Sequence, residues 1–376
     1  MPPRGPRVSG QEADDAPFMR SALALAARAL GRSAPNPAVG CLIVRDGRVL
    51  GRGWTGDGGR PHAETIALGQ AGAAARGATA YVSLEPCAHH GRTPPCSDAL
   101  IAAGIARVVI PLIDPDPRVA GRGAAALEAA GIRVDRGCCA AEAACLNLGF
   151  FTRIAEGRPM VTLKLAQSLD GRIATASGES RWITGPAARR EVHAARARAD
   201  AVLIGAGTVR ADDPMLDVRD LGLPGARPLR VVAGGRLHLP ARGRLAESAR
   251  LLPLLICHGP RADAGHRAAW AAAGAELAEI PGDPDGQMDI RAMLALLGAR
   301  GLSRVFCEGG GQLAASLVTA GLVDEIVTYA AGVVLGADGR PATGRLGLQT
   351  LAEAPRYRLA DVRRTGDDLR ARWLRA

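Results

Sequence analysis

Four side chains in the first third of the chain could hold a metal ion and move a proton beside it. They are His62 and Glu64, two residues apart, followed by Cys87 and Cys96. One imidazole and two thiolates supply three ligands of a tetrahedral zinc and leave a fourth position for water, as catalytic sites do. Bound zinc lowers the pKa of its water from about 15.7 to about 7. Glu64 is placed to take the water's proton and pass it to a leaving amine without binding the metal.

The combination of these residues is more specific than any one of them. A lone His-x-Glu most often marks the start of a surface helix, and two cysteines most often fill a core. Together, with Pro86 before Cys87, they match the zinc deaminase signature in everything except one spacing, because eight residues rather than two separate the cysteines. The sequence therefore predicts a zinc-dependent deaminase.

The neighbouring residues resemble the pyrimidine deaminase half of the bifunctional deaminase–reductases of riboflavin biosynthesis. The resemblance implies that Asn36 hydrogen-bonds the substrate heterocycle and that the loop with His89 and His90 closes over it. The loop 114–123 is also similar, with Asp116 where the family usually has Asn. Three segments carry the match, namely 35–41 (PNPAVGC), 59–64 (GRPHAE) and 85–96 (EPCAHHGRTPPC).

Glycines in the second half could bind phosphate groups. Gly309, Gly310 and Gly311 join a predicted strand to a predicted helix, whose N-terminal N–H groups can hold a phosphate. Gly205-x-Gly207 follows a second apolar strand. A plain turn is the commoner role of a glycine triplet, and neither run matches the G-x-G-x-x-G fingerprint. No Rossmann domain is therefore predicted.

Lys164 is the single lysine of a chain with 47 Lys and Arg residues. Lys is retained where a compact ammonium is wanted and a planar guanidinium does not fit, which favours a functional role for Lys164 over chance.

The second half resembles the reductase half of the same family, which has a dihydrofolate-reductase-like fold and uses NADPH. Segments 163–174, 177–184, 205–214 and 308–311 carry this match. Arg196 and Arg219 suit the substrate phosphate, because a guanidinium makes bidentate contacts. The proton donor of the reduction stays open between Lys164 and Asp212. The resemblance implies a cofactor site at Ala166, Trp182, Thr208, Asp212, Gly310 and Gly311, and a substrate site at Lys164, Ser180, Arg196, Leu216, Arg219 and Glu308.

Strands alternating with helices predict two three-layer α/β domains. Residues 1–156 form the expected cytidine-deaminase-like domain, with 1–16 as a disordered leader and the first helix at 17–32. Residues 157–376 form the expected dihydrofolate-reductase-like domain. Pro61 is predicted to open the helix that carries Glu64, and Cys96 to precede the next one directly.

The composition of the chain limits the class of protein and its expected location in the cell. The chain has 376 residues, 48% of them hydrophobic, and a net charge of +10. No apolar window reaches the length of about 18 residues that a membrane span needs. The N-terminus lacks the layout of a signal peptide, so a cytoplasmic location is expected.

The predicted activity has two steps, which require Zn²⁺ and NADPH. The first is hydrolytic deamination of 2,5-diamino-6-(5-phosphoribosylamino)pyrimidin-4(3H)-one. The second is NADPH reduction of 5-amino-6-(5-phosphoribosylamino)uracil to its ribitylamino form. The expected partner is this small phosphorylated pyrimidine, without nucleic acid or membrane, and the resemblance implies a homo-oligomer, a dimer or tetramer.

Two other functions are compatible with parts of the sequence. A nucleic-acid deaminase shares the zinc signature and a basic charge. However, most of the positive surplus lies in the second half, and aromatic residues for stacking on bases make up only 3% of the chain. The other alternative is a regulator with one inactive half. The presence of all three zinc ligands and Glu64 argues against an inactive deaminase half.

Overall fold

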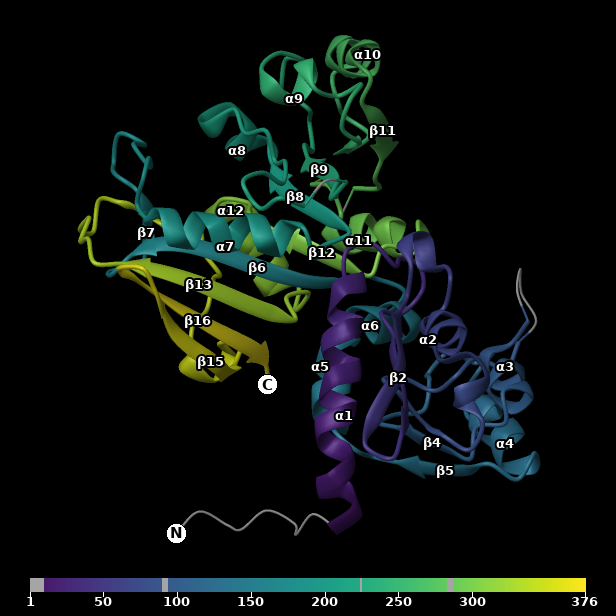
Figure 1. The fold of residues 1–376 in the computed structure, drawn as a ribbon. Coiled ribbons are helices and arrows are strands. Elements are labelled where there is room, and N and C mark those ends of the chain that lie inside the picture. Colours follow the sequence, from purple (N-terminus) through teal and green to yellow (C-terminus); the bar gives the residue numbers. More distant parts are fainter. Residues whose placement is uncertain (1–9, 90–93, 224, 283–286) are drawn as a thin grey trace. The chain divides into compact units, whose positions relative to one another are not determined.

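The computed structural model describes residues 10–89, 94–223, 225–282 and 287–376 (Figure 1). The chain divides into two compact units, Met1–Glu156 and Gly157–Ala376. Each unit combines one main sheet with helices on both of its faces, so the predicted α/β class is confirmed.

The first unit contains a five-stranded sheet in the order β2-β1-β3-β4-β5. Strand β1 pairs antiparallel with β2 and β3, whereas β3, β4 and β5 run parallel. The strands are β1 (Gly40–Arg45), β2 (Arg48–Trp54), β3 (Thr79–Val82), β4 (Arg107–Ile110) and β5 (Arg133–Arg136); the helices are α1 (Gly10–Ala26), α2 (Ala63–Ala71), α3 (Cys96–Ala102), α4 (Arg122–Ala129), α5 (Ala140–Leu146) and α6 (Leu148–Glu156).

Both faces of this sheet are covered, which explains why β1 is apolar almost throughout. Cys41 and Ile43 pack with α2, α3 and α4 on one face. Leu42 and Val44 pack with α1 and α5 on the other. Successive side chains of a strand point to opposite faces, so an uninterrupted apolar run buries both.

Helix α1 begins at Gly10, so the predicted start at residue 17 and the leader are wrong for residues 10–16. Asp15 is buried within α1. Its carboxylate accepts hydrogen bonds from the Tyr81 hydroxyl at 2.8 Å and from Arg107 Nη1 at 2.8 Å. Both partners lie far along the chain, and local sequence cannot show this anchor. Residues 1–9 lie outside the described residues.

Two helix starts near the predicted zinc ligands also differ from expectation. Helix α2 begins at Ala63, with His62 as its N-cap in extended backbone (φ −72°, ψ 154°), so Pro61 lies outside the helix. Helix α3 begins at Cys96 itself, with Pro95 as the N-cap. His62 and Cys96 therefore each lie at the first turn of a helix.

The second unit contains a nine-stranded sheet among its described residues, in the order β11-β10-β9-β8-β12-β6-β13-β16-β15. The strands from β11 to β13 in this order are all parallel, and β13, β16 and β15 pair antiparallel. A short pair, β7 (Arg172–Ala174) and β14 (Arg340–Pro341), lies apart. The main strands are β6 (Met160–Ser168), β8 (Ala201–Gly205), β9 (Leu229–Ala233), β10 (Leu254–His258), β11 (Glu276–Glu279), β12 (Arg304–Cys307), β13 (Glu325–Ala331), β15 (Tyr357–Thr365) and β16 (Asp368–Arg375).

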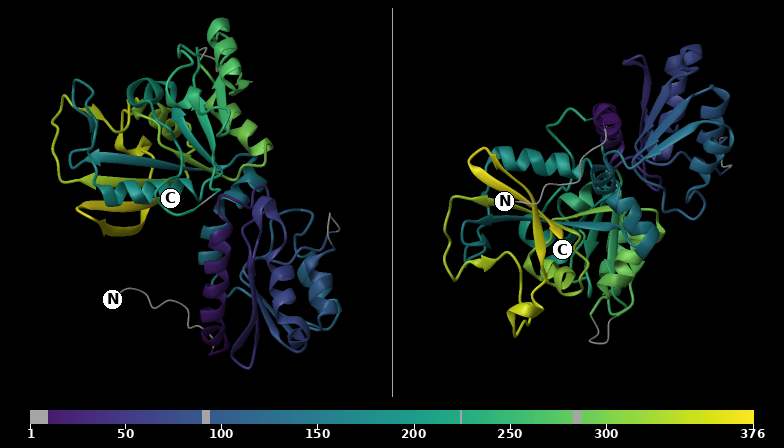
Figure 2. Two further views of the ribbon diagram at one scale, coloured as in Figure 1. Left: turned by 45° about the horizontal axis from the view of Figure 1, so that its top comes forward. Right: turned by 90° about the horizontal axis from the view of Figure 1, so that it is seen from below.

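Helices cover both faces of this second sheet (Figure 2). Val305 and Cys307 of β12 pack with α11 and α12, while Phe306 packs with α7 on the opposite face. Helices α8, α9 and α10 cover the outer strands β8, β9 and β10. The helices are α7 (Pro186–Arg196), α8 (Ala206–Asp212), α9 (Arg244–Glu247), α10 (Ala264–Ala273), α11 (Ile290–Ala299) and α12 (Gly311–Thr319).

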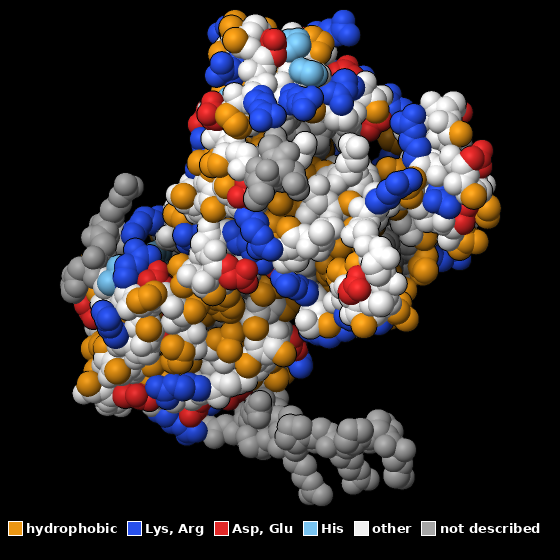
Figure 3. All heavy atoms as spheres, turned by 180° about the vertical axis from the view of Figure 1, so that it is seen from behind, with side chains coloured by type: hydrophobic (Ala, Val, Ile, Leu, Met, Phe, Trp, Pro, Cys, Tyr) orange, Lys and Arg blue, Asp and Glu red, His pale blue; other side chains and the backbone are white. Residues whose placement is uncertain are grey.

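On the face drawn in Figure 3, Lys and Arg side chains are interspersed with acidic and apolar ones. Within the described part of the chain, no helix has both the length and the apolarity needed to cross a membrane.

Candidate metal centre and reductase cavity

His62, Cys87 and Cys96 come together in the first unit, although three separate segments supply them. Their ligand atoms all lie within 4.8 Å of one another. His62 Nδ1 is 3.2 Å from Cys96 Sγ and 3.5 Å from Cys87 Sγ. The backbone N–H of Cys96 donates to Cys87 Sγ at 3.3 Å, so the first turn of α3 faces the sulfur that follows β3.

This cluster fits a zinc ion. Bond lengths of about 2.3 Å to sulfur and 2.0 Å to nitrogen separate tetrahedral ligand atoms by roughly 3.5–3.8 Å, close to the spacing seen here. Neither cysteine is in a disulfide. The Cys96 thiol, and beside it His62, lower the pKa of Cys87 to about 4, whereas donation to Cys87 raises the pKa of Cys96. Metal binding replaces such shared protons.

Glu64 lies in the first turn of α2 and is 3% exposed, yet it is not one of the three clustered ligands. Burial, with the nearby charge of Cys87, raises its pKa to about 7. A carboxyl group that titrates near neutrality can both accept and donate a proton, as a shuttle between water and a leaving amine must do.

Asn36 lies against the segment that leads to His62. Its amide Nδ2 donates to the Gly59 carbonyl at 3.1 Å. Gly59 has φ +86°, and a Cβ there would approach Asn36 Nδ2 to 2.4 Å, so only glycine allows this contact. His89 has a buried Nδ1 without a hydrogen-bond partner among the described residues. His90 and the rest of 90–93 lie outside those residues, so the predicted loop closure stays a prediction.

The loop after β4 is held by Glu85, a residue that sequence reasoning did not single out. Its buried carboxylate accepts from the backbone N–H groups of Asp114 at 3.1 Å, Gly121 at 2.9 Å and Ala124 at 3.0 Å. Asp116 accepts from Arg118 Nε at 3.0 Å and from Nη2 at 2.5 Å. The Asp116 carboxylate is thus neutralised within its own loop.

A cavity of about 430 Å³ opens in the second unit where the parallel strands β6, β8 and β12 end. Ligand sites of open α/β sheets favour this edge. Eleven of the twelve predicted reductase residues line it: Ala166, Trp182, Thr208, Asp212, Gly310, Lys164, Ser180, Arg196, Leu216, Arg219 and Glu308. Gly311 is the exception, since it starts α12 and a Cβ there would meet the Pro341 carbonyl at 2.9 Å.

Glu308 lies between two cations of the cavity lining, Arg196 and Lys164. Its carboxylate accepts from Arg196 Nε at 2.5 Å and Nη2 at 3.1 Å, and lies 3.9 Å from Lys164 Nζ. Burial opposes ionisation of Glu308, but the charge and hydrogen bonds of Arg196 outweigh it and lower the pKa. Burial lowers the pKa of Lys164, and Glu308 opposes that shift.

The glycine run has a divided role. A Cβ on Gly309 would lie 2.6 Å from the Leu313 side chain, so Gly309 is needed for packing. Gly310 is the N-cap of α12, and its N–H donates to Thr208 Oγ1 at 3.2 Å. A Cβ on Gly310 would meet only Thr208 Oγ1, at 3.7 Å, so its backbone borders open space in the cavity. This position fits a cofactor phosphate better than Gly311 does.

Several residues of the cavity were missed by sequence reasoning, including Arg181, Arg189, His193 and Arg244. Arg189 lies over the ring of Trp182, which is 67% exposed, at 4.6 Å from the ring centroid. No single-sequence signal separates such arginines from the other basic residues of so arginine-rich a chain.

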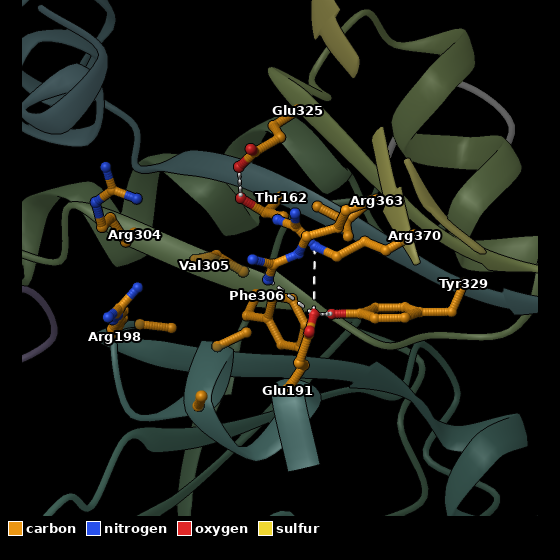
Figure 4. A pocket seen from close by; sticks show the side chains of 14 residues that line it. Thr162, Glu191, Arg198, Arg304, Val305, Phe306, Glu325, Tyr329, Arg363 and Arg370 are labelled. Atoms are coloured by element: carbon orange, nitrogen blue, oxygen red, sulfur yellow. Dashed lines mark hydrogen bonds and ion pairs between the residues drawn. The ribbon is translucent and has the colours of Figure 1, made fainter. Parts of the chain in front are cut away.

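A second hollow of about 200 Å³ lies where α7 meets β12, β13 and β16 (Figure 4). Figure 4 shows Tyr329 and Arg370 directed at Glu191, which accepts from the Tyr329 hydroxyl at 3.4 Å and lies 3.5 Å from Arg370 Nε. Arg363 Nη2 lies 3.1 Å from the same carboxylate. Because these charges are paired within the protein, no ligand is assigned to this hollow.

Comparison with known proteins gives consistent matches over both units. Residues 159–371 match the family described as RibD C-terminal domain, and residues 12–112 match the cytidine and deoxycytidylate deaminase zinc-binding region. The riboflavin biosynthesis protein RibD of Escherichia coli is 44% identical over 359 residues, covering 94% of this chain and 97% of that protein.

Solved structures give the same result. RibD of Acinetobacter baumannii superposes with a TM-score of 0.85 at 39% identity, covering 98% of this chain and 100% of that one. A diaminohydroxyphosphoribosylaminopyrimidine deaminase/5-amino-6-(5-phosphoribosylamino)uracil reductase from Thermotoga maritima superposes with a TM-score of 0.84 at 32% identity, covering 97% and 100%.

Proposed function

Because this chain belongs to the RibD family of riboflavin biosynthesis proteins and is a bifunctional deaminase and reductase, we propose how its residues divide the two reactions. The unit Met1–Glu156 deaminates 2,5-diamino-6-(5-phosphoribosylamino)pyrimidin-4(3H)-one. The unit Gly157–Ala376 reduces the resulting 5-amino-6-(5-phosphoribosylamino)uracil with NADPH. The substrates are those that the name of the Thermotoga relative implies.

In the deaminase site, His62, Cys87 and Cys96 hold zinc, which when bound acts as a Lewis acid and makes water a nucleophile at neutral pH. Glu64 takes a proton from the attacking water and protonates the ring nitrogen beside the reacting carbon. It then protonates the amine, which departs as ammonia. Asn36, fixed by the Gly59 carbonyl, orients the heterocycle.

When bound in the reductase cavity, NADPH would supply the hydride that reduces C1 of the opened ribose. The residues proposed to line the cofactor are Ala166, Trp182, Thr208, Asp212, Gly310 and Gly311. Ser180 and Leu216 contact the substrate, and Arg196 and Arg219 bind its phosphate. Glu308 keeps Arg196 and Lys164 in place. Lys164 and Asp212 are the two candidates for the proton donor.

The observation that supports this proposal most strongly is the three-ligand cluster with Glu64 buried in the adjacent first turn and left unligated. The direct test supplies purified protein with the diaminopyrimidine substrate and follows ammonia and NADPH separately. We expect ammonia release without NADPH, and NADPH oxidation in equal amount once NADPH is added. Oxidation of NADPH without prior ammonia release would contradict the order of steps.

We further propose that the chain forms a homo-oligomer, a dimer or tetramer. Strand β15 ends the nine-stranded sheet, and Leu359 and Val362 on it are each 51% exposed. Strand β15 is a nine-residue exposed edge strand, and the N–H and C=O groups on its outer side are available for pairing with another chain. Sedimentation velocity at micromolar concentration tests this: we expect a dimer or larger for the wild type and a shift toward monomer for Val362→Lys. A monomeric wild type would refute it.

A cytoplasmic location and the absence of nucleic-acid partners complete the proposal. Cys87 and Cys96 must stay reduced to bind metal, and the cytosol keeps thiols reduced. Fractionation of the host cells tests the location, and a salt-dependent RNA-binding assay tests the partner.

A further inference from the structure

The reductase cavity contains a titratable ring that the two proposed reactions leave unused. His193 lies on α7, three residues before Arg196, and is buried at the cavity wall. Its Nδ1 lies 3.2 Å from the Asp217 carbonyl oxygen. Because a carbonyl oxygen can only accept, Nδ1 carries a hydrogen in both charge states, and Nε2 is the nitrogen that gains or loses a proton.

The Asp217 carbonyl also fixes the neighbouring guanidinium. Arg196 Nη1 donates to it at 2.9 Å, and the Asp217 carboxylate accepts from Arg219 Nη1 at 2.6 Å. One loop residue therefore positions His193 together with the two arginines that the proposed function assigns to the substrate phosphate.

The charges around His193 leave the cavity with an excess of positive charge. Arg196 on the same helix, and Arg219 and Asp217 on the loop after α8, act on the ring, as does Glu308. The other charged groups that line the cavity are Lys164, Arg181, Arg189 and Arg244, against Asp212 and Asp213. A phosphate monoester carries a charge of about −1.5 to −2 at pH 7, and a positive charge on His193 would add to its attraction.

We propose that His193 is a ligand of the substrate phosphate in the reductase cavity and that substrate binding draws one proton from solvent onto Nε2. The inference rests on the proposed function, which places a phosphate beside Arg196 and Arg219. The Nε2–H bond forms as hydronium loses the same proton, and no other covalent bond is formed or broken.

The electrostatics of the free protein agree with such a proton uptake. Burial, followed by the charges of Arg196 and Arg219, lowers the pKa of His193, so the ring is neutral near neutral pH. A bound phosphate dianion favours the imidazolium and raises the same pKa. Between these two values binding takes up a proton, and the affinity for substrate falls as the pH rises.

The variant His193→Asn tests this inference in the full chain. Asparagine keeps an N–H group near the Asp217 carbonyl but cannot titrate, whereas His193→Ala removes both properties. We expect the KM of His193→Asn for 5-amino-6-(5-phosphoribosylamino)uracil to exceed the wild-type value about tenfold near pH 6.5. The two KM values should converge at alkaline pH, once His193 is neutral in both the free and the bound state. The kcat should stay within about twofold, because the phosphate is remote from the reacting carbon.

The pH profile separates a phosphate ligand from a merely structural residue. A ratio of the two KM values that stays constant from pH 6 to 9 would overturn the inference, as would a KM for His193→Asn equal to the wild-type value throughout. Wild-type protein that fails to oxidise NADPH with this substrate would instead refute the proposed reductase function on which the inference rests.

Discussion

The metal centre and the reductase cavity differ in how the fold brings their charged side chains together. The metal centre gathers four residues from a 35-residue stretch, His62 to Cys96. Three of them lie at the starts of α2 and α3, and Cys87 lies on the segment after β3. The reductase cavity collects residues from Lys164 to Gly310, on β6, α7, α8 and the loop after β12. The first needs an added cation to balance its thiolates, whereas the second pairs Glu308 with Arg196 and Lys164 in advance.

This difference teaches where each site is vulnerable. Loss of one ligand from a three-ligand centre removes the metal and with it the whole reaction. Loss of one partner from a paired network leaves a buried charge uncompensated, which affects folding as well as catalysis. Variants in the two sites should therefore fail in distinguishable ways.

The largest expected effect is in the metal centre. Glu64→Gln should keep zinc but lower the rate of ammonia release by roughly 10²- to 10⁴-fold, the usual contribution of a proton shuttle. Cys87→Ser should lose both zinc and ammonia release while NADPH oxidation with the deaminated substrate continues. Metal analysis and separate assays of the two half-reactions measure this. Zinc loss in Glu64→Gln would contradict the unligated role of the carboxylate.

A smaller effect, of a different kind, is expected for Glu308→Gln. The variant leaves Arg196 and Lys164 without a buried counter-charge, so we expect a loss of roughly 3 kcal/mol in the free energy of unfolding. The kcat/KM for reduction should fall roughly 10- to 100-fold. The matched control is Glu276→Gln, which breaks the exposed pair with Arg300.

For Glu276→Gln we expect the free energy of unfolding to fall by less than about 1 kcal/mol, and the kcat/KM for reduction to stay unchanged. Denaturant unfolding and NADPH oxidation measure both variants. Equal effects of the two substitutions would show that the buried network has no special role.

An intermediate test concerns the proton donor of the reductase. Burial lowers the pKa of Lys164, so its protonated form is lost at a lower pH than for an ordinary lysine. If Lys164 donates, kcat falls as the pH rises through this value, and we expect Asp212→Asn to keep that alkaline limb. Burial raises the pKa of the Asp212 carboxyl above its ordinary acidic value. If Asp212 donates the proton, kcat therefore falls at a much lower pH than it would with Lys164. A limb at low pH that disappears in Asp212→Asn would assign the proton to Asp212.

The smallest expected effect is at Asp116. Asp116→Asn removes a charge that Arg118 already neutralises, and the Arg118 side chain is 69% exposed. We expect a change below about 1 kcal/mol in unfolding free energy and unaltered zinc content. A loss of ammonia release comparable to that of Cys87→Ser would mean that the carboxylate itself acts in the deaminase site.

The same contrast explains how much the sequence could reveal. The zinc ligands and Glu64 are close in the chain and chemically distinctive, so their residue types and spacing are enough to predict their grouping. The early start of α1 could not be predicted, because Tyr81 and Arg107 anchor Asp15, in the second turn of this helix, from distant strands. The start of α2 was also predicted wrongly, with Pro61 as its first residue and not His62 as its N-cap. Proline is tolerated both in the first turn of a helix and in the extended segment before it, so its position does not fix the helix start.

Most residues of the reductase cavity were predictable only through the resemblance to a known family, although Lys164 and the glycine run also carried a signal of their own. His193 and Asp217 carry no local signal, because their role depends on a backbone carbonyl that the fold brings to α7. For Gly311 the glycine triplet predicted a cofactor contact, which stays a prediction. The sequence could not show that a Cβ at this position would also meet residues 341–344.

The central claim is that the two reactions use independent sites, one of which depends on a metal. The most direct measurement removes zinc with a chelator, restores it, and follows both half-reactions on the same protein. We predict that ammonia release disappears and returns with zinc, while NADPH oxidation by 5-amino-6-(5-phosphoribosylamino)uracil is unchanged throughout. Ammonia release that survives complete zinc removal, or NADPH oxidation that disappears with it, would contradict the account.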